Sequence, residues 1–452
     1  MKRKNIATIG LTAALSLGAG VCTWAAGWVQ NNGQWQYQDN SGFIVKNQWQ
    51  KGADGKWRYL NSAGYVAVDC WVDEDYYVNA EGIMLSDNWL QVAAPYSDSV
   101  IWYYFDSKGK AVKDGWKSIN NKWYFFDDLG VMQVGWVDEH RYYVDVNGGM
   151  MTGWQKLDPP PDTDYSEDYE NGYDPFALAE NDGQYWYYFK ENGKKLTPKE
   201  DGGENGVVRI GDDYYCMNMD GALQYGWKNV TGDSSITAYK YFLSSGKMVT
   251  GWYTAEPPRT LENQDSDVHW YYFNSRGVPR AAEDDTYTIK DLVSIGGKTY
   301  LFNTDGNPVT GLRKVYLDET SGNYTSYYFG KNENECWAHK GRQQVEEDNG
   351  ETSIFYFTDA GRGYTGVRDN NLYFAGKLQK AENSKYEVIQ LPGNDYGVVV
   401  NSSGKVMKNT TVKFDDGSKY KTNAAGKVIQ IDGEDVANVT GSAPREPDWY
   451  TD

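Results

Sequence analysis

The chain has 452 residues, of which 40% are hydrophobic, and this length could hold two or three ordinary domains. Its apolar surface consists largely of rings, with 38 Tyr, 18 Trp and 14 Phe, and not of the Leu, Ile and Val that fill α/β cores. A formal charge of -19 argues against nucleic acid and anionic membrane surfaces as partners, and favours a cationic ligand or a neutral sugar.

The N-terminal segment has the pattern of a secretory signal peptide. Three basic residues at positions 2–4 precede an apolar run over 6–21, and Ala25 and Ala26 provide small residues for cleavage. We expect residues 1–26 to be removed and the protein to be secreted without a transmembrane anchor. The segment carries no acidic residue, so its removal would lower the formal charge to -22.

A tryptophan recurs along the next 130 residues in steps of 18 to 27. The tryptophans in this series are Trp28, Trp49, Trp71, Trp89, Trp116, Trp136 and Trp154, and the spacing near 20 residues is typical of a repeat architecture. Only three cysteines remain after position 26, so a dense disulfide framework is not expected to stabilise the fold.

Each repeat reads as a β-hairpin. In the unit over 115–136, one strand begins at Trp116, Asn120 and Asn121 supply a tight turn, and an aromatic return strand begins at Lys122. Gly130 is the expected left-handed residue of the next turn. Because a lone hairpin is marginal in water, the units must stack, which predicts an all-β solenoid of hairpins of about 20 residues with loop insertions.

The repeats change character along the chain. We expect regular Gly-Trp hairpins over 27–157 and repeats with long insertions over 158–295, where a Pro-rich acidic loop follows Trp154. Degenerate repeats and a Val-rich C-terminal cap are expected over 296–430, and a loose tail over 431–452.

The aromatic residues of a unit could form a binding site. Trp116, Trp123 and Trp136 could close three sides of a pocket with Met132 as its floor, whereas Tyr124 would face the opposite way on the strand. Such cages hold quaternary ammonium groups against electron-rich ring faces. A single ring of this kind is typical of a packed core, but a Trp pair with a Met favours a cage.

These motifs resemble the choline-binding or cell-wall-binding repeats of Gram-positive surface proteins. Gly-Trp, a turn, Trp-Tyr-Tyr or Trp-Tyr-Phe, a turn Gly and a Met before the next Gly-Trp recur over 27–275, and weaker units over 295–430 are similar to glucan-binding and clostridial toxin repeats. The resemblance implies a hairpin solenoid with choline sites between consecutive repeats.

By position, the resemblance assigns to each site the opening Trp, the return-strand Trp, an aromatic of the following repeat and often a Met. The implied pairs are Trp28 with Trp35, Trp49 with Trp57, Trp89 with Trp102, Trp116 with Trp123 and Trp252 with Trp270, and the implied methionines are Met132, Met150 and Met248. In the short units opened by Trp71 and Trp136, Asp75 and Arg141 stand in place of the second Trp, so these units are expected to be spacers.

No catalytic or metal site is expected. The three histidines, His140, His269 and His339, are far apart and accompany no nucleophile motif or metal-ligand spacing. The carboxylates fall in turns, where their local chemistry suits them. The sequence therefore predicts a secreted, non-enzymatic protein, without a cofactor, bound noncovalently to choline-bearing teichoic acid or a related wall polymer. A glucan-binding protein, a toxin-like adhesin and a wall hydrolase are the alternatives.

Overall fold

The computed structural model describes residues 26–95, 98–161, 163, 183–203, 206–259, 261, 267–318 and 320–450. The expected signal peptide and most of the acidic loop after Trp154 lie outside these residues. The chain divides into two compact units, one made of residues 1–155 with 188–195 and the other of residues 156–187 with 196–452.

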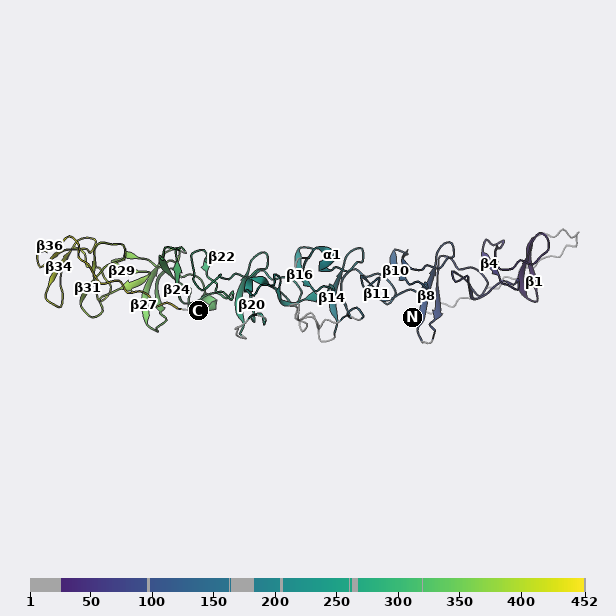
Figure 1. Cartoon of the computed structure of the whole chain (residues 1–452), viewed down its shortest axis with the longest axis horizontal. Coiled ribbons are helices and arrows are strands. Elements are labelled where there is room, and N and C mark those ends of the chain that lie inside the picture. Colours follow the sequence, from purple (N-terminus) through teal and green to yellow (C-terminus); the bar gives the residue numbers. More distant parts are fainter. Residues whose placement is uncertain are drawn as a thin grey trace, which may run out of the picture. The chain divides into compact units, whose positions relative to one another are not determined.

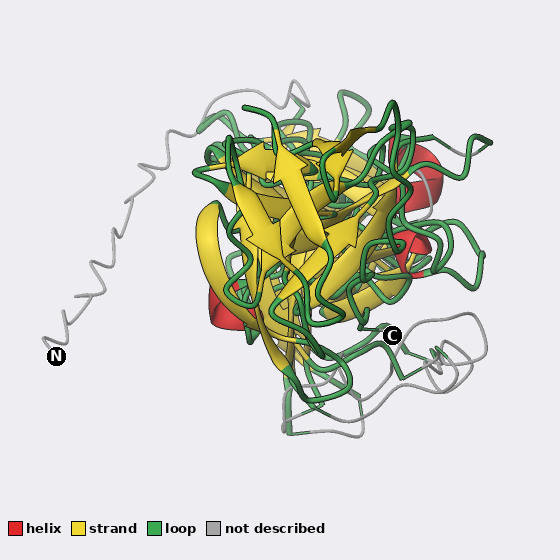
Figure 2. Cartoon of the chain, turned by 90° about the vertical axis from the view of Figure 1, so that its left-hand side faces the viewer, coloured by secondary structure: helices red, strands yellow, loops and turns green. Residues whose placement is uncertain are grey.

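Strands dominate the described chain (Figure 2), and the prediction of an all-β fold built of hairpins is confirmed. The strands of the first half are β1 (Gly27–Asn31), β2 (Gln34–Gln38), β3 (Gln48–Lys51), β4 (Trp57–Leu60), β5 (Cys70–Val72), β6 (Tyr76–Val78), β7 (Asn88–Ala93), β8 (Val100–Phe105), β9 (Gly115–Ile119), β10 (Lys122–Phe126), β11 (Gly135–Val137), β12 (Tyr142–Val144), β13 (Gly153–Leu157), β14 (Tyr185–Phe189), β15 (Val207–Ile210), β16 (Asp213–Met217), β17 (Leu223–Gln224) and β18 (Gly226–Asn229).

The strands of the second half are β19 (Tyr239–Phe242), β20 (Gly251–Ala255), β21 (His269–Phe273), β22 (Val293–Ile295), β23 (Lys298–Tyr300), β24 (Leu312–Tyr316), β25 (Tyr324–Tyr328), β26 (Gly341–Glu346), β27 (Thr352–Phe357), β28 (Gly366–Arg368), β29 (Asn371–Phe374), β30 (Lys377–Gln379), β31 (Tyr386–Ile389), β32 (Val398–Asn401), β33 (Thr411–Lys413), β34 (Lys419–Thr422), β35 (Val428–Ile431) and β36 (Glu434–Asp435). Short helices occur at α1 (Pro198–Asp201), η3 (Ile236–Ala238) and η4 (Glu333–Glu335).

Most strands pair only within their own antiparallel hairpin, and Figure 1 follows these hairpins in chain order within each unit. In the hairpin β9–β10, Ile119 pairs with Lys122 across the turn, and Asn120 and Asn121 have φ of 50° and 64°. Gly130 has φ of 84°. The predicted turn chemistry of this unit is therefore confirmed.

The core lies between successive hairpins. The last residue of many return strands is a phenylalanine that is at most 1% exposed, namely Phe105, Phe126, Phe189, Phe242 or Phe273. A backbone hydrogen bond connects neighbouring units. Met132 N–H donates to Trp102 O at 2.8 Å, and Met150 N–H donates to Trp123 O at 2.9 Å. Each unit therefore covers the apolar face that its predecessor would leave in water.

Larger sheets appear toward the C-terminus. Strands β26 to β30 form a five-stranded sheet and β33 to β36 a four-stranded one, and Val399, Val412 and Val428 fill a core beside the latter. The valine-rich end of the sequence thus replaces aromatic packing with aliphatic packing.

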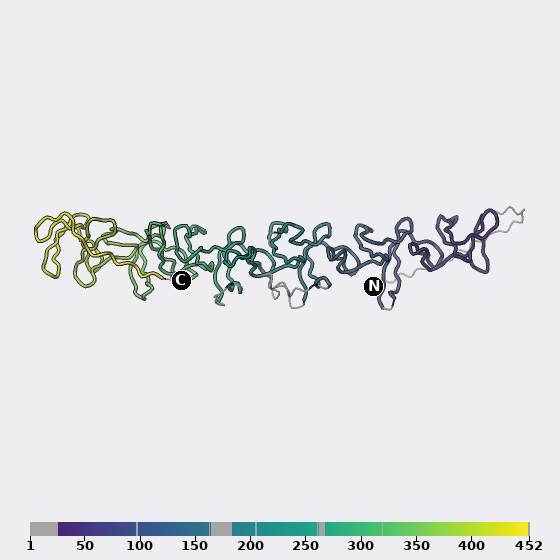
Figure 3. The backbone as a smooth tube through the Cα atoms, in the orientation of Figure 1, coloured from purple at the N-terminus to yellow at the C-terminus, as the bar shows by residue number. Residues whose placement is uncertain are grey.

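The expectation of a loose C-terminal tail is wrong for residues 436–450. This segment runs back along the chain (Figure 3): Val439 O accepts from Gly397 N–H, Ser442 N–H donates to Val388 O, and Tyr450 N–H donates to Leu312 O at 3.0 Å. Trp449 and Tyr450 pack against the core cluster around Leu312. The segment stays ordered because its partners come from earlier hairpins.

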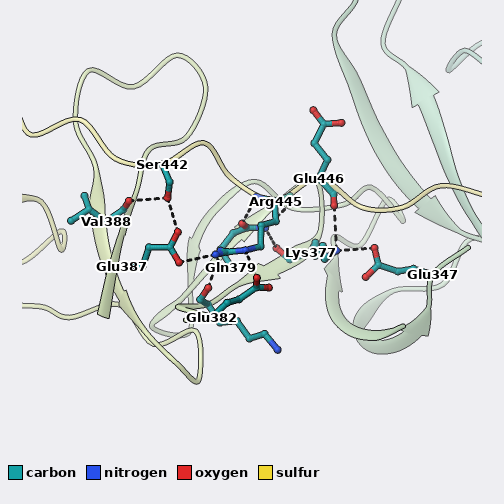
Figure 4. Close-up of polar contacts among 10 residues, drawn as sticks. Glu347, Lys377, Gln379, Glu382, Glu387, Val388, Ser442, Arg445 and Glu446 are labelled. Carbon is teal, nitrogen blue, oxygen red and sulfur yellow. Dashed lines mark hydrogen bonds and ion pairs between the residues drawn. The ribbon is translucent and has the colours of Figure 1, made fainter. Parts of the chain in front are cut away.

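Charged groups fix the same segment (Figure 4). Arg445 Nη2 donates to Glu387 Oε2 at 2.7 Å, and Ser442 Oγ donates to Glu387 Oε1 at 2.7 Å. Burial raises the pKa of Glu387, but these hydrogen bonds outweigh it and the pKa is lowered. The fully buried Glu347 accepts from Lys377 Nζ at 2.9 Å and from Asp448 N–H at 2.7 Å.

Candidate functional site

The hairpin β7–β8 places two tryptophans on one face. Trp89 pairs across the strands with Tyr104, and Trp102 lies on the same side because it precedes Tyr104 by two residues. The centroids of the Trp89 and Trp102 rings are 6.3 Å apart, with an interplanar angle of 86°. The pair thus forms two perpendicular walls.

The next hairpin supplies the other two sides. The Tyr124 ring lies 5.0 Å from the Trp89 ring at 68°, and the backbone bond from Met132 to Trp102 brings the Met132 thioether beneath the rings. Val146 and Asn147, from the turn after β12, complete the rim. One site therefore draws on three consecutive units.

These residues enclose a cavity of about 220 Å³, lined by Trp89, Trp102, Tyr124, Met132, Val146 and Asn147. None of these residues is charged. Three electron-rich ring faces around an uncharged cavity can attract a cation whose surface consists of methyl groups, because such a cation needs no hydrogen-bond acceptor.

The position of Tyr124 corrects the sequence-based expectation. Tyr124 does face away from Trp123 along β10, but that opposite face looks onto the preceding unit and forms a wall of the Trp89 cavity. The two faces of one return strand therefore serve two successive sites.

The cage expected at Trp116 is assembled from other residues than predicted. Tyr142 lies 5.0 Å from Trp116, and Met150 shares a cavity of about 270 Å³ with Trp123. Met132 serves the preceding site instead, since a methionine packs back toward the unit before its own. The Trp123 side chain is 47% exposed and has no ring partner among the described residues, whereas Trp102 lies beside the Trp89 ring. The Trp136 ring packs on Tyr143 and Phe189.

The pair Trp49 and Trp57 follows the same plan. The Tyr76 ring lies 5.4 Å from Trp49, and Met84 N–H donates to Trp57 O at 2.9 Å. Trp57 is 41% exposed, and Lys51 Nζ lies 5.9 Å from its ring centroid. An exposed indole at this position differs from a core ring, which would be buried.

The pair Trp252 and Trp270 is brought together across its insertion. Their rings are 6.1 Å apart at 83°, and Tyr300 of the next hairpin lies 5.0 Å from Trp252. Met248, the third implied methionine, lines a different cavity. Met248 N–H donates to Tyr214 O at 2.8 Å, which places the side chain in an earlier cavity.

At the first pair, Trp28 and Trp35, the third wall is a cation. Arg58 occupies the position that Tyr124 has at the Trp89 site, and its guanidinium lies 5.9 Å from the Trp28 ring. Asp54 holds Arg58 through two hydrogen bonds of 3.0 and 2.7 Å, which lower the pKa of Asp54. The chain's own cation therefore faces this ring.

The short unit opened by Trp136 is filled in the same manner. Arg141 O accepts from Lys195 N–H at 2.7 Å, so Arg141 stands where the second Trp would be and Lys195 where the Met would be. The Lys195 ammonium lies 4.8 Å from the Trp136 ring, and the residue is only 6% exposed.

At Trp71, the ring of Tyr103 lies 4.9 Å away, and Asp75 takes the place of the second Trp. Hydrogen bonds from Lys113 and Lys110 lower the pKa of Asp75. The sites at Trp71 and Trp136 thus differ in composition from the one at Trp89, as the sequence indicates.

Sequence reasoning did not identify which aromatic of the following repeat forms the third wall of these sites. The residues in question share one position, directly after the second-Trp position of the following return strand, and they are Tyr76, Tyr103, Tyr124, Tyr142 and Tyr300. The sequence does contain a signal for this wall: an aromatic residue recurs directly after the second Trp, or after the residue that replaces that Trp in the short units. It was hidden by the expectation that the next opening tryptophan, such as Trp136 for the site at Trp116, supplies the third wall.

Comparison with known proteins confirms the resemblance of these repeats to cell-wall-binding repeats. The family described as "Putative cell wall binding repeat" matches residues 101–111, 114–132, 180–195 and 267–278. Two of these segments contain Trp102, Tyr124 and Met132, three of the residues that line the cavity at Trp89.

A curated relative, glucosyltransferase-S from Streptococcus mutans serotype c, is 27% identical over 212 residues. The match covers 46% of this chain and 12% of that protein. The chain thus corresponds to a small part of the relative's length.

Solved structures with similar features come from Streptococcus pneumoniae. Choline binding protein F is 21% identical, with a TM-score of 0.37 over 70% of this chain and 99% of that one. CbpJ is 20% identical, with a TM-score of 0.39 over 70% and 100%. The modular autolysin LytC is 21% identical, with a TM-score of 0.38 over 65% and 54%. Scores below 0.5 do not establish a common overall arrangement.

Within the described ranges, no helix is long and apolar enough to cross a bilayer. The same residues contain no group of three or more His, Cys, Asp or Glu side chains that could hold a metal ion.

Proposed function

We propose that the protein is secreted and attaches noncovalently to the cell envelope by binding choline, or a related quaternary ammonium group, on teichoic acid or another wall polymer. In this proposal the hairpins stack as a β-solenoid and the chain itself is non-enzymatic. The observation that carries the proposal is the uncharged cavity of about 220 Å³ between Trp89, Trp102, Tyr124 and Met132.

The expected affinity of one such site is low. Each ring contributes about 0.5 to 2 kcal/mol toward a trimethylammonium group. After the cost of immobilising the ligand, three rings would leave about 4 kcal/mol, which corresponds to a millimolar site. Several sites engaged by one polymer would raise the effective affinity by about 10²- to 10⁴-fold. The tryptophan pairs at Trp49, Trp116 and Trp252 are the further candidates.

Binding of an α-glucan is the second candidate function. The match to part of a glucosyltransferase favours it, and so do the half-exposed indoles of Trp35, Trp57 and Trp123, whose flat faces suit stacking on sugar rings. A glucan-binding protein would be retained on dextran and would be indifferent to choline.

Affinity chromatography separates these functions. We expect the mature chain to bind a tertiary-amine resin, to elute with millimolar choline and to resist an equal concentration of sodium chloride. The double variant Trp89→Ala/Trp102→Ala should elute earlier, whereas Trp449→Ala, outside the cages, should elute as the native chain does. Retention on dextran with no retention on the amine resin would favour glucan binding, and a cleared band on a cell-wall zymogram would refute a non-enzymatic role.

A further inference from the structure

The unit over 206–217 carries a second kind of inter-repeat cavity. It is lined at the positions of the Trp89 cavity, but with different residues: Val207 for Trp89, Tyr214 for Trp102, Lys240 for Tyr124, Met248 for Met132, Ser275 for Val146 and Arg276 for Asn147. The correspondence follows from the strand registers and from one backbone hydrogen bond. Met248 N–H donates to Tyr214 O, just as Met132 N–H donates to Trp102 O at the Trp89 site.

These replacements enlarge the cavity and change its charge. Its volume is about 590 Å³, against about 220 Å³ at Trp89, and it has a valine in place of an indole and a lysine in place of a phenol ring. Two of the three ring walls are lost, so a quaternary ammonium ion would find one ring and a facing ammonium group. The cavity is therefore unsuited to choline.

The charges at this cavity are mainly positive. Among the described residues that line it, Arg209, Lys240 and Arg276 are basic and Asp201 is acidic. The Lys240 ammonium donates to Arg276 O, which holds it beside Arg276. Arg209 is partly neutralised by Asp212 at 3.2 Å, whereas the Arg276 side chain has no ion-pair partner among the described residues. Such a positive site is unusual in a chain with a formal charge of -19.

The remaining lining suits a polyol or sugar. Thr231, Thr237 and Ser275 place hydroxyl groups at the rim, while Val208 and Val230 form a buried apolar floor. Tyr214 is 42% exposed and offers a ring face. A phosphate group would accept charge-assisted hydrogen bonds from Lys240 and Arg276, with the attached carbons resting on the floor.

We propose that this cavity binds a phosphate-bearing polyol or sugar unit and not a quaternary ammonium group. The inference does not require choline binding at Trp89. It assigns opposite charge preferences to two inter-repeat sites of one chain, so that one polymer carrying both cations and phosphates could be held at both.

Phosphorus NMR of glycerol 1-phosphate with the mature chain tests the proposal. We expect saturable line broadening with millimolar affinity, at least as tight as that of inorganic phosphate. Lys240→Met/Arg276→Ala should weaken binding about tenfold or more. Lys56→Met, which removes one positive charge from an exposed turn of the other unit, should leave it unchanged.

A control variant and a second ligand distinguish phosphate binding from choline binding and from the binding of carboxylates. Trp89→Ala/Trp102→Ala should lose choline affinity and keep the phosphate response, so failure of choline binding and failure of this inference are distinguishable. Absence of saturable binding, an unchanged affinity in Lys240→Met/Arg276→Ala with a native circular dichroism spectrum, or stronger binding of glucuronate than of glycerol 1-phosphate would each overturn the proposal.

Discussion

Replacement of Tyr124 by alanine tests whether each cage is built by residues of successive hairpins. The Tyr124 ring is one of three ring walls of the Trp89 cavity and lies 5.0 Å from Trp89. Losing one ring costs about 0.5 to 2 kcal/mol of binding free energy, which raises the dissociation constant for choline at this site about 2- to 30-fold. The hairpin should still fold, because Ile119 and Phe126 keep its buried core.

A choline titration followed by tryptophan fluorescence measures this change, and the choline concentration that elutes the protein from an amine resin reports the combined effect of all sites. Tyr124→Phe keeps the ring and should bind as the native chain does. Trp123→Ala should affect a different site, so the losses of the two single variants should add in the double variant. If Tyr124→Ala leaves every choline affinity unchanged in a folded protein, the three-unit cage is refuted.

Three other changes test neighbouring features. Lys195→Met removes the ammonium group that faces Trp136 and should add one choline equivalent to the binding stoichiometry measured by calorimetry; an unchanged stoichiometry would contradict self-occupation of that site. Lys377→Met leaves the buried carboxylate of Glu347 without its cation. The free energy of unfolding, measured by urea denaturation, should fall by about 3 to 5 kcal/mol. A loss under about 1 kcal/mol would contradict a stabilising role for this buried ion pair. Because the pKa of Glu387 is lowered in the folded state, its contribution to stability is complete above about pH 4.5 and is lost as pH falls through the folded-state pKa. Glu387→Gln should therefore flatten the dependence of the melting temperature on pH in this range. An unchanged pH profile would contradict a stabilising role for the Glu387 carboxylate.

Local features of the fold could be predicted from the sequence. Residues within one hairpin are close in sequence, so alternation along a strand and the Asn120-Asn121 turn were sufficient to place Trp116 and Phe125 opposite each other. The tryptophan spacing predicted the number of residues per unit for the same reason.

Contacts between units could not be predicted in this way. The spacing of tryptophans does not predict whether Met132 packs toward the unit before it or the unit after it. In the structure, the hydrogen bond from Met132 N–H to Trp102 O places Met132 against the preceding unit. The C-terminal segment looked loose because its partners are remote, as with Tyr450 and Leu312. Polar composition near a terminus does not exclude such long-range pairing.

The two faces of β10 contribute to two different sites, and this arrangement has an evolutionary consequence. Trp123 belongs to the site with the following hairpin and Tyr124 to the site with the preceding one. A duplication or exchange of one hairpin would therefore create hybrid sites on both sides of that hairpin, without any substitution inside the exchanged segment. The ligand preferences of such a chain can diversify by recombination alone, because each preference belongs to a junction and not to a single hairpin.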